Sequence, residues 1–262
     1  MDAVFERVVV GVDGTELGFE ALGQALVLAP AERSTVRAVT ALDTSGAARA
    51  GFDAARWTDA LTREAAATRD EAETLLGGRA GTSAEVVPGD PVRVLRDARD
   101  ESEATLLAVG GQHSSRFLGI MLGDVGTQLL HDGTCSVLVA RLGPDQPWEP
   151  RTVVVGFDGS APALAALEAA DELASRLGSV IQTVSATGGR PLTREGDWID
   201  RVDAWEAAEP AALLVEHSRH ADLVVVGSRG LHGIRALGSV SERVAHQGQC
   251  SVLVVHAPSD HD

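Results

Sequence analysis

The chain has 262 residues, 44% of them hydrophobic and 23% charged, which is long enough for one large domain or two ordinary domains with buried cores. Its 38 acidic and 22 basic residues give a formal net charge of -16, and every basic residue is an arginine. This charge disfavours a nucleic-acid surface and an anionic membrane surface. The lack of lysine excludes a P-loop lysine, a Schiff base and a lysine general base.

The apolar runs and the cysteines indicate a cytoplasmic protein. The longest apolar runs are much shorter than the roughly 20 residues of a membrane helix, and the acidic, strand-like start MDAVFERVVVGVD does not resemble a signal peptide. Cys135 and Cys250 occur in matching contexts, TCSVLVA and QCSVLVV. We interpret them as small core residues at the start of a repeated strand rather than as a disulfide.

The sequence contains an internal repeat, in which a similar unit occurs twice. VVVGVDGT at 8–15 returns as VVVGFDGS at 153–160, and LLAVG at 106–110 returns as LVVVG at 223–227. The second copy is 28 residues shorter between its second and fourth strands, and two residues shorter in the loop that follows. Repeats of this kind predict two similar structural units. We expect a first domain at 1–142, a proline-rich linker at 143–150 and a second domain at 151–262.

Each copy alternates short β-branched runs with alanine- and leucine-rich helical stretches, the pattern of an α/β fold with a parallel sheet. In copy one this predicts, in chain order, a strand at 6–12, a helix at 16–30, a strand at 34–42, a helix at 54–77, a strand at 83–88, a helix at 91–101, strands at 105–110 and 136–140, and between these two a helix at 124–132. In copy two it predicts a strand at 151–157, a helix at 161–177, strands at 179–185 and 203–208, helices at 210–219 and 239–247, and strands at 222–227 and 251–256.

Copy two has no counterpart of the predicted helix at 54–77. In copy one, Trp57, Leu61, Ala65 and Leu75 give this helix an apolar side that we expect to cover one face of the sheet. The corresponding face of copy two should therefore expose apolar residues, unless the other copy or a second chain covers it.

A glycine-rich loop follows the fourth strand of each copy, at the edge of a parallel sheet where ligands bind. In copy two it reads GSRGLHGIRALGS, from 227 to 239, and leads into a helix. Glycines allow close backbone approach, and a helix start is an anion site, so the loop is a candidate phosphate cradle. The alternative is a simple turn, since Ser239 and Glu242 have the spacing of a capping box.

Three stretches together resemble the universal stress protein family: VVVGFDGS at 153–160, DLVVVGSRG at 222–230 and LGSVSERVAHQGQCSVLVV at 237–255. The resemblance implies two tandem Rossmann-like, doubly wound domains, each with a five-stranded parallel sheet of order 3-2-1-4-5. It also implies that the copies pair about a pseudo-twofold axis through their last strands. In the nucleotide-binding branch, ATP is held by the pattern G-x2-G-x9-G-[ST]. Transferred to copy two, that pattern and its adenosine contacts imply the cofactor-binding residues Asp158, Val184, Gly227, Gly230, Gly238, Ser239, Val240 and Ser241.

Both copies depart from the family pattern. In copy two, Gly230 and Gly238 enclose seven residues instead of nine. Copy one keeps nine, but His113 replaces the second glycine and Asp124 replaces the hydroxyl residue, where its carboxylate would cap the helix and repel a phosphate. We therefore expect ATP, possibly with Mg²⁺, in copy two alone. In copy one, Asp13 and Val39 match the adenosine-contacting positions, but the residues expected to bind the phosphates are replaced.

The remaining arginine and histidine candidates do not predict a further binding or catalytic site. Arg229 and Arg235 could add positive charge near a triphosphate, although we favour solvent-facing positions for both. Glu216, His217 and His220 lie close on a predicted helix but lack further metal ligands. No catalytic set is found, so we predict no metal site and no enzyme.

The resulting hypothesis is a stress-response regulator that binds an adenine nucleotide. Its alternatives are a tandem scaffold that binds no nucleotide and acts through protein contacts, and a slow ATP hydrolase. Nucleic acid and membranes are not expected as partners, and a homodimer is possible.

Overall fold

The computed structural model describes residues 4–46, 53–113, 120–121, 124–132, 134–143, 147–186, 201–228 and 239–256. The chain divides into two compact units, residues 1–110 and 111–262. The boundary between these units lies inside copy one, because the last helix and strand of that copy belong to the second unit. The predicted boundaries of the two sequence repeats, at 142 and 151, stay a prediction.

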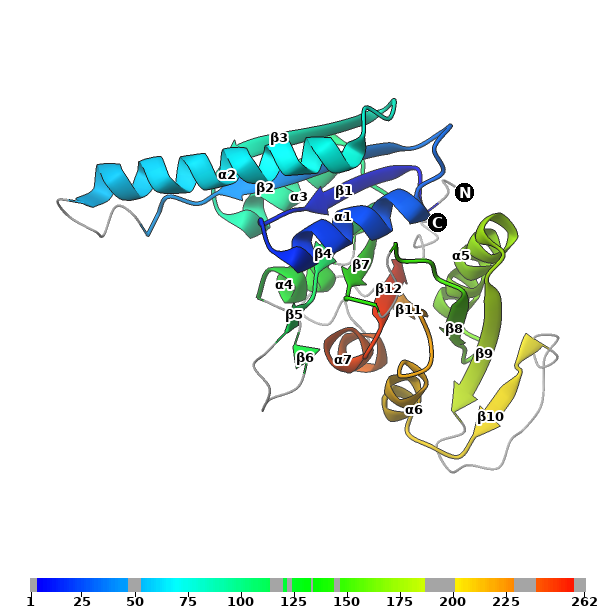
Figure 1. Ribbon diagram of the computed structural model, residues 1–262. Helices are drawn as coiled ribbons and strands as arrows, with labels where there is room; N and C mark the ends of the chain where they lie inside the picture. The colour runs from blue at the N-terminus through cyan, green and yellow to red at the C-terminus, as the bar shows by residue number, and fades with distance from the viewer. Residues whose placement is uncertain are drawn as a thin grey trace, which may run out of the picture. The chain divides into compact units, whose positions relative to one another are not determined.

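The first unit is a parallel sheet with helices between its strands (Figure 1). Its strands are ordered β3-β2-β1-β4, and all neighbouring pairs are parallel. The two inner strands have buried apolar centres; Val8, Val9 and Val10 of β1, for example, are at most 2% exposed. The elements in chain order are β1 (Arg7–Gly11), α1 (Glu16–Leu28), β2 (Thr35–Leu42), α2 (Ala54–Leu76), β3 (Thr82–Pro88), α3 (Pro91–Glu101) and β4 (Leu106–Gly110).

The helices of the first unit begin and end at residues suited to those positions. Thr15 caps α1 by accepting a hydrogen bond from the Gly18 amide at 3.1 Å. Asp90 caps α3 in the same way, with Pro91 as the first helical residue. Gly77 ends α2 in the left-handed conformation with a φ of 59°, which glycine adopts without strain. These signals explain why the helix bounds could be predicted from sequence.

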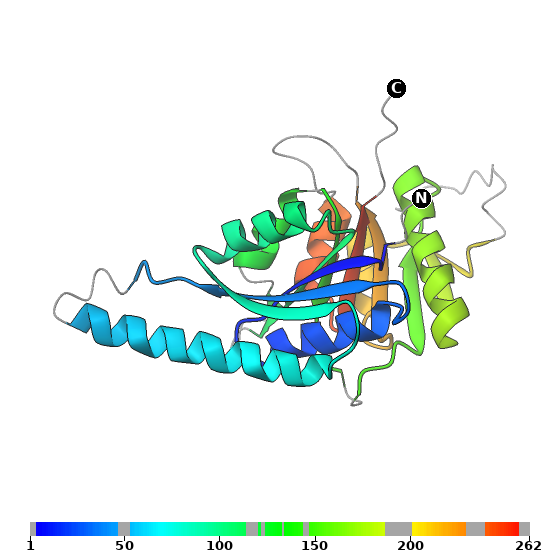
Figure 2. The same ribbon diagram turned by 90° about the horizontal axis from the view of Figure 1, so that it is seen from above.

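Helix α2 covers the sheet only with its second half. Ala65, Thr68, Ala72 and Leu76 are buried and follow a helical spacing, and the helix runs alongside β2 and β3 (Figure 2). Trp57, in the first turn, is 57% exposed. Leu75, predicted to be on the buried side, is 47% exposed, so that assignment was wrong by one position along the helix.

The second unit holds the rest of copy one and all of copy two. Strands β10, β9, β8, β11 and β12 are parallel and lie in that order, which is the predicted order 3-2-1-4-5. The elements in chain order are β5 (Gln112–His113), β6 (Ile120–Met121), α4 (Asp124–Asp132), β7 (Ser136–Ala140), β8 (Thr152–Gly156), α5 (Ala161–Leu177), β9 (Val180–Ala186), β10 (Ala204–Glu206), α6 (Pro210–His217), β11 (Leu223–Ser228), α7 (Ser239–Gln247) and β12 (Ser251–His256).

The two last strands pair as the resemblance implies. β7, the last strand of copy one, runs antiparallel to β12, the last strand of copy two, with Leu138 opposite Leu253. Two reciprocal hydrogen bonds flank this pair. The amide of Arg141 donates to Ser251 Oγ at 3.0 Å, and the amide of His256 donates to Ser136 Oγ at 3.1 Å. The repeat in sequence thus becomes a near-symmetric contact within the second unit.

The structure describes no helix between β9 and β10, although residues 187–200 lie outside the described part. Along β9, side chains alternate between the two faces of the sheet. Val184 belongs to the core beneath α6, so Thr183 and Ser185 point to the opposite face. Both are small and polar, and each is less than 5% exposed. The exposed apolar face expected in copy two is therefore not found at these two positions.

Candidate functional site

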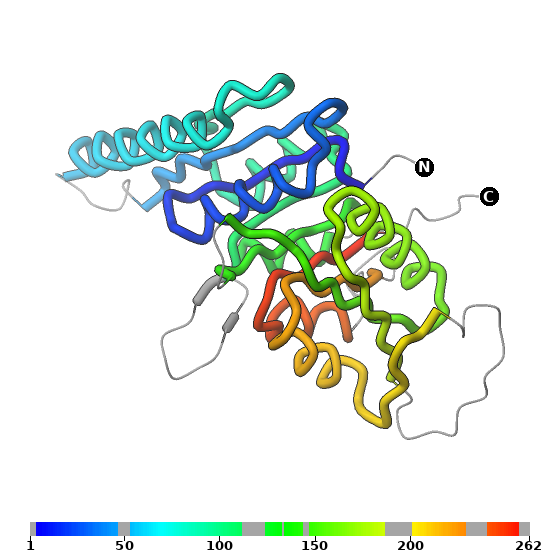
Figure 3. Tube along the Cα trace, turned by 45° about the vertical axis from the view of Figure 1, so that its right-hand side comes forward, coloured from blue at the N-terminus to red at the C-terminus, as the bar shows by residue number. Residues whose placement is uncertain are grey.

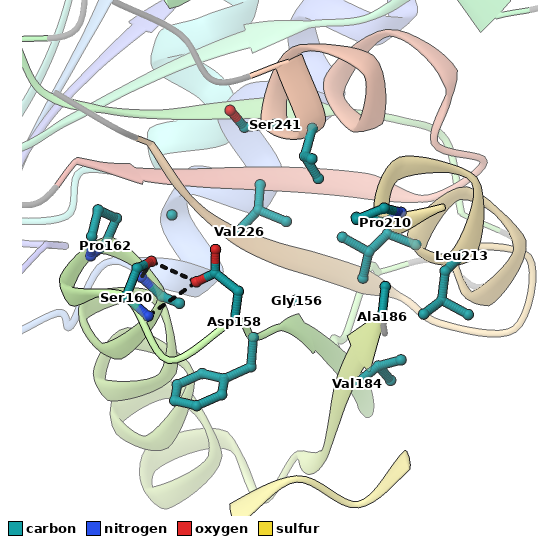
Figure 4. Close-up of a pocket in the computed structure, with 15 residues that line it drawn as sticks. Gly156, Asp158, Ser160, Pro162, Val184, Ala186, Pro210, Leu213, Val226 and Ser241 are labelled. Atoms are coloured by element: carbon teal, nitrogen blue, oxygen red, sulfur yellow. Dashed lines mark hydrogen bonds between the residues drawn. The ribbon is translucent and has the colours of Figure 1, made fainter. Parts of the chain in front are cut away.

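A cavity of about 240 Å³ lies at the carboxyl ends of the strands of copy two. Its walls come from the ends of β8, β9 and β11 and from the first turns of α5, α6 and α7 (Figure 4). Helices α6 and α7 pack against each other (Figure 3). β8 and β11 are neighbours although they are the first and fourth strands of the copy, so the strand order reverses at the cavity. This is the switch point at which open parallel sheets bind ligands.

Five of the eight predicted binding residues line this one cavity. Gly230 and Gly238 lie outside the described residues, and Ser239 is the first residue of α7, without a described side chain. Arg229 and Arg235 are also outside the described part. The five lining residues come from four separate elements or loops: Asp158, Val184, Gly227, Val240 and Ser241.

The floor of the cavity is apolar. Val184 and Ala186 at the end of β9 lie across from Leu213 of α6 (Figure 4), and Leu214 also lines the cavity. Gly156 leaves room for this packing, because a Cβ at that position would be 2.7 Å from Leu214 Cδ1. A planar, weakly polar group therefore fits this part of the cavity better than a charged one.

Asp158 organises the loop that follows β8. Its Oδ1 accepts hydrogen bonds from the amide of Ser160 at 3.0 Å and from Ser160 Oγ at 2.5 Å (Figure 4). Ser160 Oγ in turn caps α5 at the Ala163 amide. In copy one, Asp13 makes the same pair of bonds to Thr15. The aspartate thus has a structural role in both copies, in addition to lining the cavity in copy two.

Gly227 is required by packing, a reason that sequence analysis missed. A Cβ at Gly227 would lie 2.2 Å from the carbonyl oxygen of Pro162, in the first turn of α5. In copy one, a Cβ at Gly110 would lie 2.8 Å from the carbonyl oxygen of Leu17. The glycine at the end of the fourth strand therefore permits a helix to approach the strand, whether or not a ligand is bound.

Two of the three helix starts around the cavity are capped by side chains. Ser160 caps α5, and the Glu209 carboxylate caps α6 by accepting from the amides of Ala211 at 3.2 Å and Ala212 at 3.0 Å. These hydrogen bonds, led by the one from Ala212, lower the pKa of Glu209. The third helix start, that of α7, comes directly after the glycine-rich loop, at the place predicted for phosphates.

An ion pair that sequence analysis also missed joins the two helices beside the cavity. Arg243 Nη1 of α7 is 2.9 Å from Glu209 Oε2 at the start of α6. A weak signal was present in the sequence, since Glu209 precedes a proline at a predicted helix start. Nothing in the sequence indicates that Arg243, 34 residues later, reaches it.

The capping box predicted for Ser239 and Glu242 stays a prediction, because the side chain of Ser239 lies outside the described part. Glu242 Oε1 lies 3.5 Å from His131 Nε2 of α4. In copy one, α4 begins at Asp124, the position that corresponds to Ser239. The loop before it contains the short antiparallel pair of β5 and β6, in which His113 is opposite Ile120. That strand pair was not predicted.

The remaining candidates have structural explanations. His217 Nε2 is 2.9 Å from Glu206 Oε1, and among the described residues no cluster of three or more His, Cys, Asp or Glu could hold a metal. Neither cysteine forms a disulfide, and burial raises the pKa of Cys250 to about 12, as expected for a core thiol. Trp148 is 6% exposed. Within the described ranges, no helix is long and apolar enough to cross a membrane.

The protein has a doubly wound parallel sheet with a cavity at its switch point, the place where α/β proteins of this architecture bind ligands. The sequence model of the universal stress protein family matches residues 5–141 and 199–256. The chain belongs to the universal stress protein family.

Similar proteins extend this finding over the whole chain. Universal stress protein Rv2623 of Mycobacterium tuberculosis is 29% identical over 214 residues, covering 70% of this chain and 71% of its own length. Universal stress protein Rv1996 of the same organism is 28% identical over 305 residues and covers 97% of this chain and 96% of itself. The crystal structure of a universal stress protein from Archaeoglobus fulgidus matches with a TM-score of 0.73 and 21% identity, covering 98% and 99% of the two chains. This last likeness shows the fold.

Proposed function

We propose that the protein is a stress-response regulator that binds an adenine nucleotide, ATP, in the cavity of copy two. The observation that carries the proposal is the convergence of Asp158, Val184, Gly227, Val240 and Ser241 on one cavity at the switch point of the sheet. These residues lie up to 83 positions apart in the chain and were selected by the family pattern alone.

The chemistry of the cavity suits the parts of a nucleotide. The apolar floor between Val184 and Leu213 accepts the faces of a purine base. The Asp158 carboxylate accepts hydrogen bonds from ribose hydroxyls. The amides at the start of α7, together with the hydroxyl of Ser241, suit a phosphate chain. Magnesium, if present, would accompany the phosphates.

Binding without efficient catalysis is the corresponding expectation. Asp158 is the only ionisable side chain among the described residues that line the cavity, and the sequence has no lysine. The described lining therefore offers one carboxylate, which already accepts two hydrogen bonds from Ser160, and no second ionisable group to act with it. We propose a cytoplasmic binding protein, and turnover of ATP with added magnesium distinguishes it from a slow hydrolase.

Calorimetry with ATP and mass analysis of small molecules released on denaturation test the proposal. We expect a Gly238→Asp variant to lose ATP binding, because the new carboxylate would take the helix amides and repel phosphate. Gly123→Asp, the matching change in copy one, is the control and should leave binding unchanged. If wild-type protein releases no nucleotide and shows no heat with millimolar ATP, the nucleotide proposal is lost and the scaffold alternative is favoured.

A further inference from the structure

The ion pair between Arg243 and Glu209 has a position and a chemistry that suit control of the proposed nucleotide site. We propose that Arg243 binds the phosphate chain of the nucleotide, and that Glu209 holds its guanidinium in place and competes with the phosphates for it. The proposal rests on nucleotide binding in copy two and adds a residue that the family pattern does not contain.

The pair lies beside the cavity at the level of the helix starts. Side chains on a helix lean toward its N-terminus, so the guanidinium of Arg243 is directed back toward the first turn of α7. That turn supplies Val240 and Ser241 to the cavity wall. The acceptor, Glu209, directly precedes Pro210, which lines the cavity from α6. The guanidinium of Arg243 is therefore held at the start of α6, by a residue whose direct neighbour Pro210 lines the cavity.

The two partners differ in how firmly they are held. Two α6 amides fix the carboxylate of Glu209, at 3.2 and 3.0 Å from its oxygens. The Arg243 side chain is 47% exposed, and its ion pair is made through Nη1. An exposed ion pair of this kind is weak, because water and salt compete with it. Arginine can thus move to a triphosphate, whose oxygens accept two parallel hydrogen bonds from the guanidinium.

Copy one lacks this arrangement. Asp90 caps α3 as Glu209 caps α6, with Arg93 N at 3.0 Å from Asp90 Oδ1. The position that matches Arg243 in the repeat is Gln128, which carries no charge. The arginine is therefore present only in the copy that keeps the glycine at 230 and the hydroxyl residue at 239.

The test compares ATP, adenosine and inorganic tripolyphosphate as ligands of wild type, Arg243→Gln and Glu209→Gln by calorimetry at low salt. Arg243→Gln should lower the affinity for ATP and for tripolyphosphate about 10-fold. The affinity for adenosine should change less than about twofold, because adenosine has no phosphate. Glu209→Gln should raise the affinity for ATP about threefold, because the competing charge is gone, while the one remaining oxygen can still accept from one of the two α6 amides. Arg219→Gln, which removes an exposed arginine paired with Glu216, is the control and should change none of them.

The outcomes separate this proposal from the one on which it rests. If both variants lower the affinities for ATP and adenosine by the same factor, the ion pair only links α6 to α7, and the proposal that Arg243 binds the phosphates is wrong. If wild type binds ATP and the affinity of Arg243→Gln is unchanged, this proposal fails while nucleotide binding stands. If wild type binds neither ATP nor adenosine, both proposals fail.

Discussion

At the scale of single residues, glycines show how one residue type serves different purposes in this protein. Gly227 and Gly110 occupy matching positions, and at both the Cβ of any other residue would meet the backbone of the first turn of a helix. Gly23, within α1, has no neighbouring atom within 4 Å of where its Cβ would be. The sequence does not distinguish these three glycines, and only the packing around them shows at which two a side chain would collide with a helix.

Alanine substitutions should separate these cases. Gly227→Ala should lower the free energy of unfolding by about 1–3 kcal/mol, since helix and strand must move apart to admit the methyl group. Gly110→Ala should lower the free energy of unfolding by less, because the added Cβ would lie 2.8 Å from the nearest backbone atom, compared with 2.2 Å at Gly227. Gly23→Ala is the control and should raise stability by about 0.5–1 kcal/mol, since alanine favours a helix interior. Urea unfolding measures all three, and a neutral Gly227→Ala would contradict the packing argument.

At the scale of elements, α7 is held at its C-terminal end by a side chain from copy one. Arg141, which follows β7, is 2% exposed and donates from Nε to the Gly248 carbonyl and from Nη2 to the Ala245 carbonyl, each at 2.6 Å. Burial lowers the pKa of Arg141 to about 10. The carbonyls at the end of a helix stabilise a positive charge, which offsets part of this burial cost.

We expect Arg141→Ala to lower the free energy of unfolding by about 3 kcal/mol, because the α7 carbonyls lose their donors inside the protein. Arg141→Lys should recover only part of this, since a single ammonium group cannot reproduce the fork of the guanidinium. Arg151, whose side chain is 73% exposed, provides the control, and Arg151→Ala should change stability by less than about 0.5 kcal/mol. Equal effects of the two alanine variants in thermal or urea unfolding would refute this role of Arg141.

At the scale of the whole molecule, the second unit depends on a strand from the first repeat. β7 pairs with β12 through Val137, Leu138 and Val139, all less than 5% exposed. A chain cut at the predicted repeat boundary loses this strand and exposes the edge of β12. Open apolar edges of this kind pair with other chains.

Two fragments test this dependence. A fragment of residues 151–262 should melt at a lower temperature than one of residues 111–262, because it lacks both β7 and Arg141. Analytical ultracentrifugation and thermal unfolding provide the comparison. A stable, monomeric 151–262 fragment would show that the second repeat folds without the first and would support the predicted boundary at 151.

The sequence by itself determined the two repeats and, apart from the short strands β5 and β6, the described helices and strands, with bounds within two residues of those observed. Apolar periodicity and helix caps are local signals, and they can be read along the chain. The resemblance to a family added the order of the strands and five of the residues that line the cavity. The tertiary structure alone decided that Gly227 is needed for helix packing, that only half of α2 covers the sheet, and that Arg243 meets Glu209. These features depend on distances between elements far apart in the chain, which are set by how side chains fill the space between helices and strands.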